Sequence, residues 1–116
     1  MRAYEIMIIA DGELSESDAS HLVNRVTEQV TTAGGTVASV DKWGKRRFAY
    51  EIDHATEGYY LVLEILAEGG ALDELERTLR LADDVVRHKL IRLPDHEAVR
   101  RGLFDESGAI PAAAGQ

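Results

Sequence analysis

Alternating apolar and polar positions predict several strands along the chain. Residues 2–10 place Tyr4, Ile6 and Ile8 on one face and further apolar side chains on the other, which indicates a central strand. Residues 59–67 show the clearest alternation of the chain, and one of their faces is purely aliphatic and aromatic. We expect that face to point into the core, because a strand buries its apolar side.

Two other segments repeat their apolar residues at spacings of three and four, as an amphipathic helix does. The first is predicted over about 15–33, where Ser15 and Asp18 form a capping-box pattern at its start and two consecutive glycines end it. The second begins its apolar stripe at Leu72 and ends near Asp83. Each helix has a single apolar stripe, so each is expected to cover one side of a sheet.

Two further strands complete the pattern. Residues 36–52 are rich in β-branched and aromatic side chains, and Gly44 in their midst predicts a bulge or bend. A polar turn is expected from Asp53 to Gly58. Residues 85–93 alternate poorly and carry basic side chains on both faces, which suits an edge strand.

The order strand, helix, strand, strand, helix, strand predicts an α+β fold of the ferredoxin-like type, β-α-β-β-α-β. In that topology the first and third strands are central, and both helices cover one face of a four-stranded antiparallel sheet. The opposite face is left for solvent or a partner. We assign residues 1–93 to this domain and expect 94–116 to be a flexible C-terminal tail, because the pattern dissolves after Leu93.

Composition excludes several classes of protein. A chain of 116 residues allows one domain, and without cysteine it has no disulfide or thiolate chemistry. No signal peptide or membrane-spanning run is recognised, so we expect an intracellular protein. None of the four histidines pairs with another at helical metal-site spacing, and no nucleophile elbow occurs. No catalytic residue, cofactor or metal is predicted.

Charge changes this picture. The net charge of −8 argues against nucleic acid, because Lys and Arg supply phosphate affinity. Residues 42–50, however, hold four basic side chains and no acidic one, interleaved with aromatic residues. Such a segment suits phosphates and unpaired bases. The alternative, which the residues alone leave open, is that the Lys and Arg only protect an edge strand from aggregation.

Several motifs in order resemble the bacterial ribosomal small-subunit protein six family. They are the N-terminal Arg2-x-Tyr4-Glu5-Ile6-Met7, the Gly34-Gly35 pair, Trp43-Gly44-Lys45-Arg46-Arg47-x-Ala49-Tyr50, Glu57-Gly58-Tyr59-Tyr60, and Leu75-Glu76-Arg77-x-Leu79-Arg80-Leu81 followed by Val86-Arg87. The resemblance covers about residues 1–93. It departs from the family at Phe48, where Leu is common, and at Glu51, where Pro is common.

The resemblance implies a ferredoxin-like domain of the cytoplasmic ribosome that binds small-subunit ribosomal RNA together with small-subunit ribosomal protein eighteen, and it implies no enzymatic activity. No DNA or membrane partner is expected. The candidate RNA-binding residues are Arg2, Lys42, Trp43, Lys45, Arg46, Arg47, Arg87, Lys89 and Arg92. The candidate partner-binding residues are Tyr4, Tyr50, Tyr60, Leu103 and Phe104.

Two other functions are weighed against this one. A free-standing single-strand RNA-binding module would need paired aromatic residues on the open face of the third strand, yet the alternation there leaves only Tyr60 outside. A small enzyme or ligand-sensing domain of acylphosphatase type would need a phosphate-binding loop after the first strand. Here that loop reads Asp11-Gly12-Glu13 and would repel phosphate.

Overall fold

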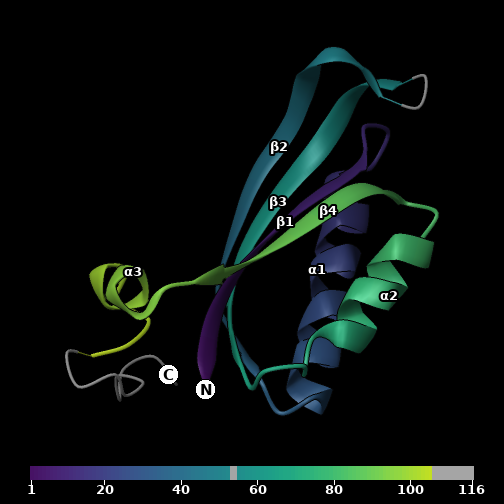
Figure 1. Ribbon diagram of the computed structural model, residues 1–116. Coiled ribbons are helices and arrows are strands. Elements are labelled where there is room, and N and C mark those ends of the chain that lie inside the picture. Colours follow the sequence, from purple (N-terminus) through teal and green to yellow (C-terminus); the bar gives the residue numbers. More distant parts are fainter. Residues whose placement is uncertain (53–54, 106–116) are drawn as a thin grey trace.

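A computed structural model describes the backbone of residues 1–52 and 55–105, and the side chains of 1–48 and 56–105. Figure 1 shows a four-stranded sheet with two long helices on one side and a short helix beyond it. The elements are β1 (Arg2–Asp11), α1 (Glu16–Thr32), β2 (Thr36–Ile52), β3 (Ala55–Ala67), α2 (Asp73–Leu81), β4 (Val85–Leu93) and α3 (Asp95–Arg100).

The sheet has the order β2-β3-β1-β4, and every neighbouring pair is antiparallel. β1 and β3 are therefore central and β2 and β4 lie at the edges, as the sequence predicted. α1 and α2 pack side by side on one face (Figure 1). This is the predicted α+β ferredoxin-like fold, and its opposite sheet face, which we call the open face, carries no long helix.

The main core lies between the sheet and the two long helices. Alternate residues of each central strand face the helices, as predicted. They are Tyr4, Ile6 and Ile8 from β1 and the apolar face of β3. The helices contribute one stripe each. The buried members of the core are Tyr4, Ile6, Ile8, Ala10, Ala19, Leu22, Val26, Val30, Tyr59, Leu61, Leu63, Ile65, Ala67, Leu72, Leu75 and Leu79.

The structure confirms the helix cap and the β-bulge that the sequence predicts. The Ser15 hydroxyl accepts a hydrogen bond from the amide of Asp18, and the Asp18 carboxylate accepts one from the amide of Ser15. Gly44 has a φ of 83°, and the β2–β3 register shifts beside it. Only glycine takes such a φ without strain, so this bulge follows directly from the sequence.

The expected turn from Asp53 to Gly58 is wrong for its second half. β3 already begins at Ala55, and Glu57 and Gly58 pair with Arg47 and Arg46 of β2. Continuous backbone pairing along the two strands outweighs the local turn preference. The resulting β2–β3 hairpin reaches beyond the end of β1 and the long helices (Figure 1).

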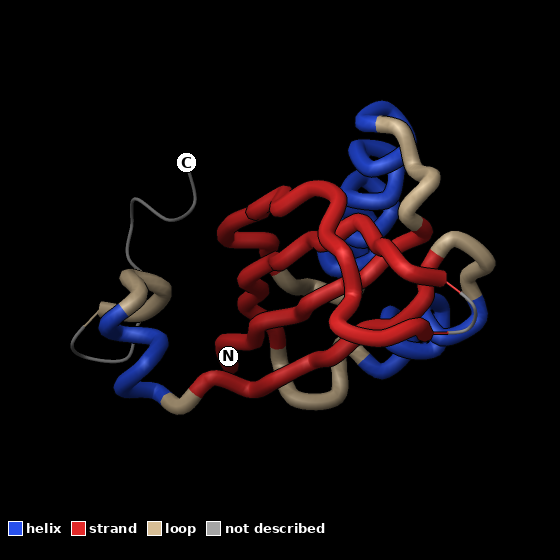
Figure 2. Tube along the Cα trace, turned by 90° about the horizontal axis from the view of Figure 1, so that it is seen from above, coloured by secondary structure: helices blue, strands red, loops and turns tan. Residues whose placement is uncertain are grey.

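Residues 94–105 differ from the expected flexible tail. They contain α3, which lies on the opposite side of the sheet from α1 and α2 (Figure 2). Their buried side chains build a second, smaller core against one end of the open face, made of Ala3, Leu66, Leu93, Ala98, Leu103 and Phe104. The apolar residues 98, 103 and 104 were too few to form a helical stripe, and their burial depends on the sheet. The remainder of the expected tail, 106–116, lies outside the described residues.

Gly58 on β3 lets the Phe48 ring pack closely over the open face. A Cβ atom at Gly58 would lie 2.6 Å from Cγ2 of Ile9 and 2.8 Å from Cζ of Phe48. Phe48 is 8% exposed and Ile9 lies on a central strand, so neither side chain moves freely. At Gly69 a Cβ would instead meet the end of the Arg2 side chain, which is flexible.

We therefore expect Gly58→Ala to lower the free energy of unfolding by about 1–3 kcal/mol, because it overpacks the open face. Gly69→Ala is the matched control and should stay within about 1 kcal/mol of the parent, since the arginine moves aside and the unfolded chain loses entropy. Urea unfolding followed by circular dichroism measures both. Equal effects at the two glycines would contradict this account of the packing.

Candidate interaction surfaces

The open face consists of rows of side chains that run across the sheet. Residues directly opposite each other on neighbouring strands share a face, so the pairing register gives the rows. From the hairpin end to the α3 end they are Trp43–Tyr60–Ile9–Arg87, Asp41–Val62–Met7–Lys89, Ser39–Glu64–Glu5–Ile91 and Thr36–Leu66–Ala3–Leu93. The character of the face changes along this series from aromatic and basic to acidic and then apolar.

The basic residues of β2 are divided between the two faces of the hairpin. Trp43 stacks on Tyr60 with ring centroids 6.2 Å apart, and Arg46 lies opposite Gly58, so both belong to the open face. Lys45 and Arg47 pair with the alternate positions of β3 and point to the other side. The basic segment identified in the sequence therefore presents its cations on both faces of the hairpin.

Lys42 also lies on the helix side, where its ammonium donates a hydrogen bond of 2.7 Å to the Ser20 hydroxyl of α1. Lys45, Arg46 and Arg47 are exposed, and none of them forms an ion pair with any residue that the structure describes. Their charges are consequently available to an external anion.

Aromatic side chains flank these charges on the open face. Trp43 is 42% exposed, and its indole N–H donates to Asp41 at 3.0 Å, which fixes the ring over the sheet. Tyr60 is half-buried between Trp43 and Phe48, whose ring centroid lies 6.3 Å from that of Tyr60. The exposed part of the indole is the stacking surface at this end of the molecule. The side chain of Tyr50 lies outside the described residues.

The remaining basic candidates are also divided. Arg87 and Lys89 of β4 are exposed and lie on the open face, opposite Ile9 and Met7. Arg92 pairs with Tyr4 and so lies on the helix side. Arg2 is on that side as well, because its partner Ala67 belongs to the main core and its guanidinium lies over Gly69. The open face therefore gathers Trp43, Arg46, Arg87 and Lys89 out of the predicted RNA-binding set.

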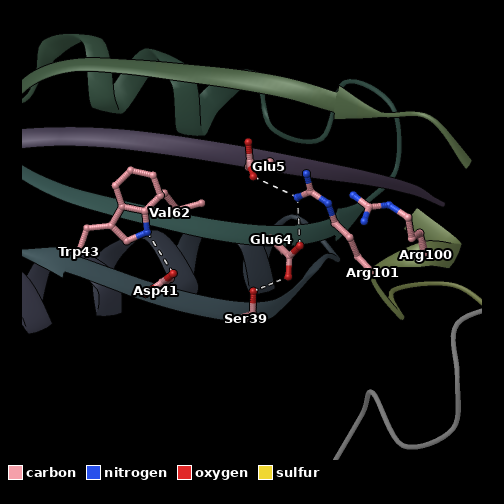
Figure 3. A pocket seen from close by; sticks show the side chains of 8 residues that line it. All are labelled: Glu5, Ser39, Asp41, Trp43, Val62, Glu64, Arg100 and Arg101. Atoms are coloured by element: carbon pink, nitrogen blue, oxygen red, sulfur yellow. Dashed lines mark hydrogen bonds and ion pairs between the residues drawn. The ribbon is translucent and has the colours of Figure 1, made fainter. Parts of the chain in front are cut away.

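An acidic row lies between the aromatic row and the α3 end, and sequence reasoning missed its role. Glu5 and Glu64 are directly opposite each other on β1 and β3, an arrangement that is unfavourable for two like charges. Arg101 resolves it: one guanidinium nitrogen, Nη1, lies 3.0 Å from Glu5 and 3.2 Å from Glu64 (Figure 3). The Ser39 hydroxyl donates a further bond of 2.7 Å to Glu64.

A second guanidinium nitrogen of Arg101 binds a residue of the same C-terminal segment. Its Nε donates to Glu97 at 2.8 Å, and Glu97 also accepts from Arg100. Hydrogen bonds from Arg100 and Arg101 lower the pKa of Glu97 to about 2, and the bonds to Glu97, Glu5 and Glu64 raise the pKa of Arg101. Glu97 and Arg101 are therefore both charged at neutral pH.

Arg101 borders a pocket of about 420 Å³ on the open face (Figure 3). The pocket extends from the acidic row toward the hairpin and is lined by Glu5, Ser39, Asp41, Trp43, Val62, Glu64, Arg100 and Arg101. The only signal for it in the sequence is a polar side chain at one position of each otherwise apolar central strand.

Most of the candidate partner-binding residues are covered within this chain. Tyr4 is 8% exposed in the main core, and Leu103 and Phe104 are 5% and 4% exposed in the second core. Tyr60 contributes only a half-buried ring under Trp43.

Among the described residues no group of His, Cys, Asp or Glu side chains is arranged to hold a metal ion. In the same part of the chain no helix has the length and apolar character that crossing a membrane requires.

The sheet order and the one-sided helices place the molecule in the ferredoxin-like class, which hosts many unrelated functions. A family model described as ribosomal protein S6 matches residues 3–92. Small ribosomal subunit protein bS6 of Salinispora arenicola is 48% identical over 92 residues, which cover 79% of this chain and 96% of that protein. The same protein of Carboxydothermus hydrogenoformans is 45% identical with the same coverage.

A solved structure agrees with these relatives. The crystal structure of 30S ribosomal protein S6 from Thermotoga maritima matches with a TM-score of 0.78 at 34% identity, covering 86% of this chain and 94% of that one. The chain belongs to the ribosomal protein S6 family. It is accordingly a protein of the small ribosomal subunit, a cytoplasmic particle, as the resemblance in its motifs implied.

The Arg101 network leads to a titration experiment. We expect the Glu97 carboxyl to titrate near pH 2 in an NMR pH series, and Arg100→Ala or Arg101→Ala to raise its pKa because each removes a hydrogen bond to the charged form. A lowered pKa in the folded state stabilises the fold above the unfolded value of about 4.5, and that stabilisation is lost as the pH falls through about 2.

Arg77→Ala is the control for this titration, since Arg77 pairs with Glu74 on α2, on the other side of the sheet. It should leave the Glu97 pKa unchanged. A Glu97 pKa that stays near 4.5 in the parent chain would show that the network does not form in solution.

Proposed function

We propose that the chain binds small-subunit ribosomal RNA through the β2–β3 hairpin, in a complex that also contains small-subunit ribosomal protein eighteen. The observation that carries the proposal is the set of exposed cations on both faces of the projecting hairpin, next to an exposed tryptophan. Guanidinium groups bind phosphate oxygens, and an indole stacks on an unpaired base.

The acidic residues near α3 do not cancel the charge of Arg46. Glu64 lies six positions along β3 from Gly58, the partner of Arg46. At about 3.3 Å per residue this is roughly 20 Å, more than twice the Debye length of about 8 Å at physiological salt. Two carboxylates are nearer, because Asp11 lies in the row of Arg46 and Glu57 lies opposite Arg47. The charge that a phosphate meets at the hairpin is set by its cations together with these two carboxylates.

Cations on both faces also suit a projecting element. Arg46 and, one row nearer to α3, Arg87 face one way, while Lys45 and Arg47 face the other. RNA strands on either side of the hairpin would each meet a positive charge. This arrangement supports a structural role in a folded RNA, and the proposal includes no catalytic step.

The register argues against a free-standing single-strand binder. Tyr59 is 3% exposed and donates its hydroxyl to Glu16 of α1, so it belongs to the main core. Tyr60 lies beneath Trp43. With one exposed aromatic surface rather than a pair among the described side chains, this face offers little for successive bases. The acidic remainder instead suits a basic protein partner, which supports protein eighteen.

Reversing two hairpin charges tests the proposal. We expect Arg46→Glu with Arg47→Glu to weaken binding to small-subunit ribosomal RNA at least tenfold in the presence of protein eighteen. The slope of log affinity against log salt should also become shallower by about one to two, since each lost phosphate contact removes roughly 0.7–0.9 from it. A salt-titrated filter-binding assay measures both quantities.

The matched control is Arg77→Glu with Arg80→Glu, which changes the net charge equally on α2. It should leave the affinity within about twofold. If both double variants weaken binding alike, the effect is one of overall charge and the hairpin is not the RNA site. Tight binding of short unstructured RNA without protein eighteen would favour the single-strand module.

A further inference from the structure

The α3 end of the open face is occupied by a segment of the chain itself. Residues 95–104, which we call the C-terminal cover, place Leu103 and Phe104 on Ala3 and Leu66 of the central strands. They also bring Arg101 onto the row formed by Glu5 and Glu64. The face that the fold leaves open for a partner is thus partly closed in the free protein.

We propose that the C-terminal cover is an intramolecular stand-in for an arginine-bearing segment of a basic protein partner, which displaces it from the open face. This inference rests on the proposed function, because the partner we have in view is small-subunit ribosomal protein eighteen. Arg101 shows which chemistry the face accepts: a guanidinium between two opposed carboxylates, followed by apolar side chains on Ala3 and Leu66.

The cover is suited to exchange. α3 has six residues, fewer than an isolated helix needs to be stable in water, so its structure depends on the sheet. The Arg101 side chain is 29% exposed, which leaves its ion pairs open to screening by salt. When released, Arg101 still has the Glu97 carboxylate four residues away in its own segment, so displacement does not leave the cation without an acidic neighbour.

The pocket beside Arg101 gives an incoming segment more to bind. It continues past Glu64 to Asp41, Val62 and Trp43, where a second cationic side chain would meet a carboxylate and the exposed face of an indole. RNA is the poorer occupant, because Glu5, Asp41 and Glu64 on this part of the face would repel phosphates. The hairpin and the cover region therefore serve different partners.

The test uses the full-length chain and a charge reversal with a matched control. Arg101→Glu places a third carboxylate beside Glu5 and Glu64 and should release the cover. Arg77→Glu changes the net charge equally at a side chain of α2, on the other side of the sheet, that is 62% exposed and pairs with Glu74. Leu103→Ala with Phe104→Ala is a second release variant that adds no charge. Hydrogen exchange of the cover amides confirms release in each case.

The first probe is a fluorescent peptide with the sequence of residues 99–104, Val-Arg-Arg-Gly-Leu-Phe. We expect it to bind both release variants at least tenfold more tightly than the parent or Arg77→Glu, since a competent state populated at one tenth costs tenfold in apparent affinity. Glu64→Gln added to Arg101→Glu should remove most of that gain. No difference between Arg101→Glu and Arg77→Glu would overturn the stand-in.

The second probe is purified small-subunit ribosomal protein eighteen. Release variants should bind it at least tenfold more tightly than Arg77→Glu, and unchanged or weaker binding would overturn displacement by this partner. If protein eighteen binds neither the parent nor any variant, the proposed function fails. The peptide result still decides whether the face accepts an arginine-bearing segment, so the two failures are distinguishable.

Discussion

The antiparallel pairing of β1 with β3 determines which side chains can meet anywhere on this molecule. Ten consecutive pairs, from Arg2 with Ala67 to Asp11 with Gly58, fix the phase of both central strands. One phase gives the main core its Ile and Leu layer beneath α1 and α2. The other produces the rows of the open face, including the opposed Glu5 and Glu64. A shift of one residue would bury the glutamates and expose the core, so the core and the interaction surfaces depend on a single register.

That dependence explains how far the sequence could be interpreted. Element order, the faces of the central strands, the Ser15 cap and the bulge at Gly44 all follow from local patterns, and each is confirmed. The basic segment was also recognisable, but its division between two faces was not, because it depends on pairing across the bulge. Arg101 was missed for a related reason: its partners are about forty and a hundred positions away, and no local period reports such a contact.

The distribution of charge matters more here than its total. A net charge of −8 describes the chain as a whole, yet an ion close to the surface senses mainly the charges within a Debye length. Along the open face the local charge changes sign, from Arg46 and Arg87 at the hairpin end to Glu5 and Glu64 near α3. The two proposed partners, an RNA and a basic protein, are thus attracted to opposite ends of one face of a small domain.

The opposed glutamates give this separation a physical basis. Two carboxylates side by side on central strands cost stability unless a cation lies between them, and an apolar pair at the same positions would pack without that requirement. Because both glutamates are present, the stability of the open face depends on a guanidinium between them. In the free chain Arg101 supplies it, together with the burial of Leu103 and Phe104. Any segment that replaces the cover must bring a cation as well as apolar surface, and this double requirement excludes both RNA and ordinary hydrophobic peptides.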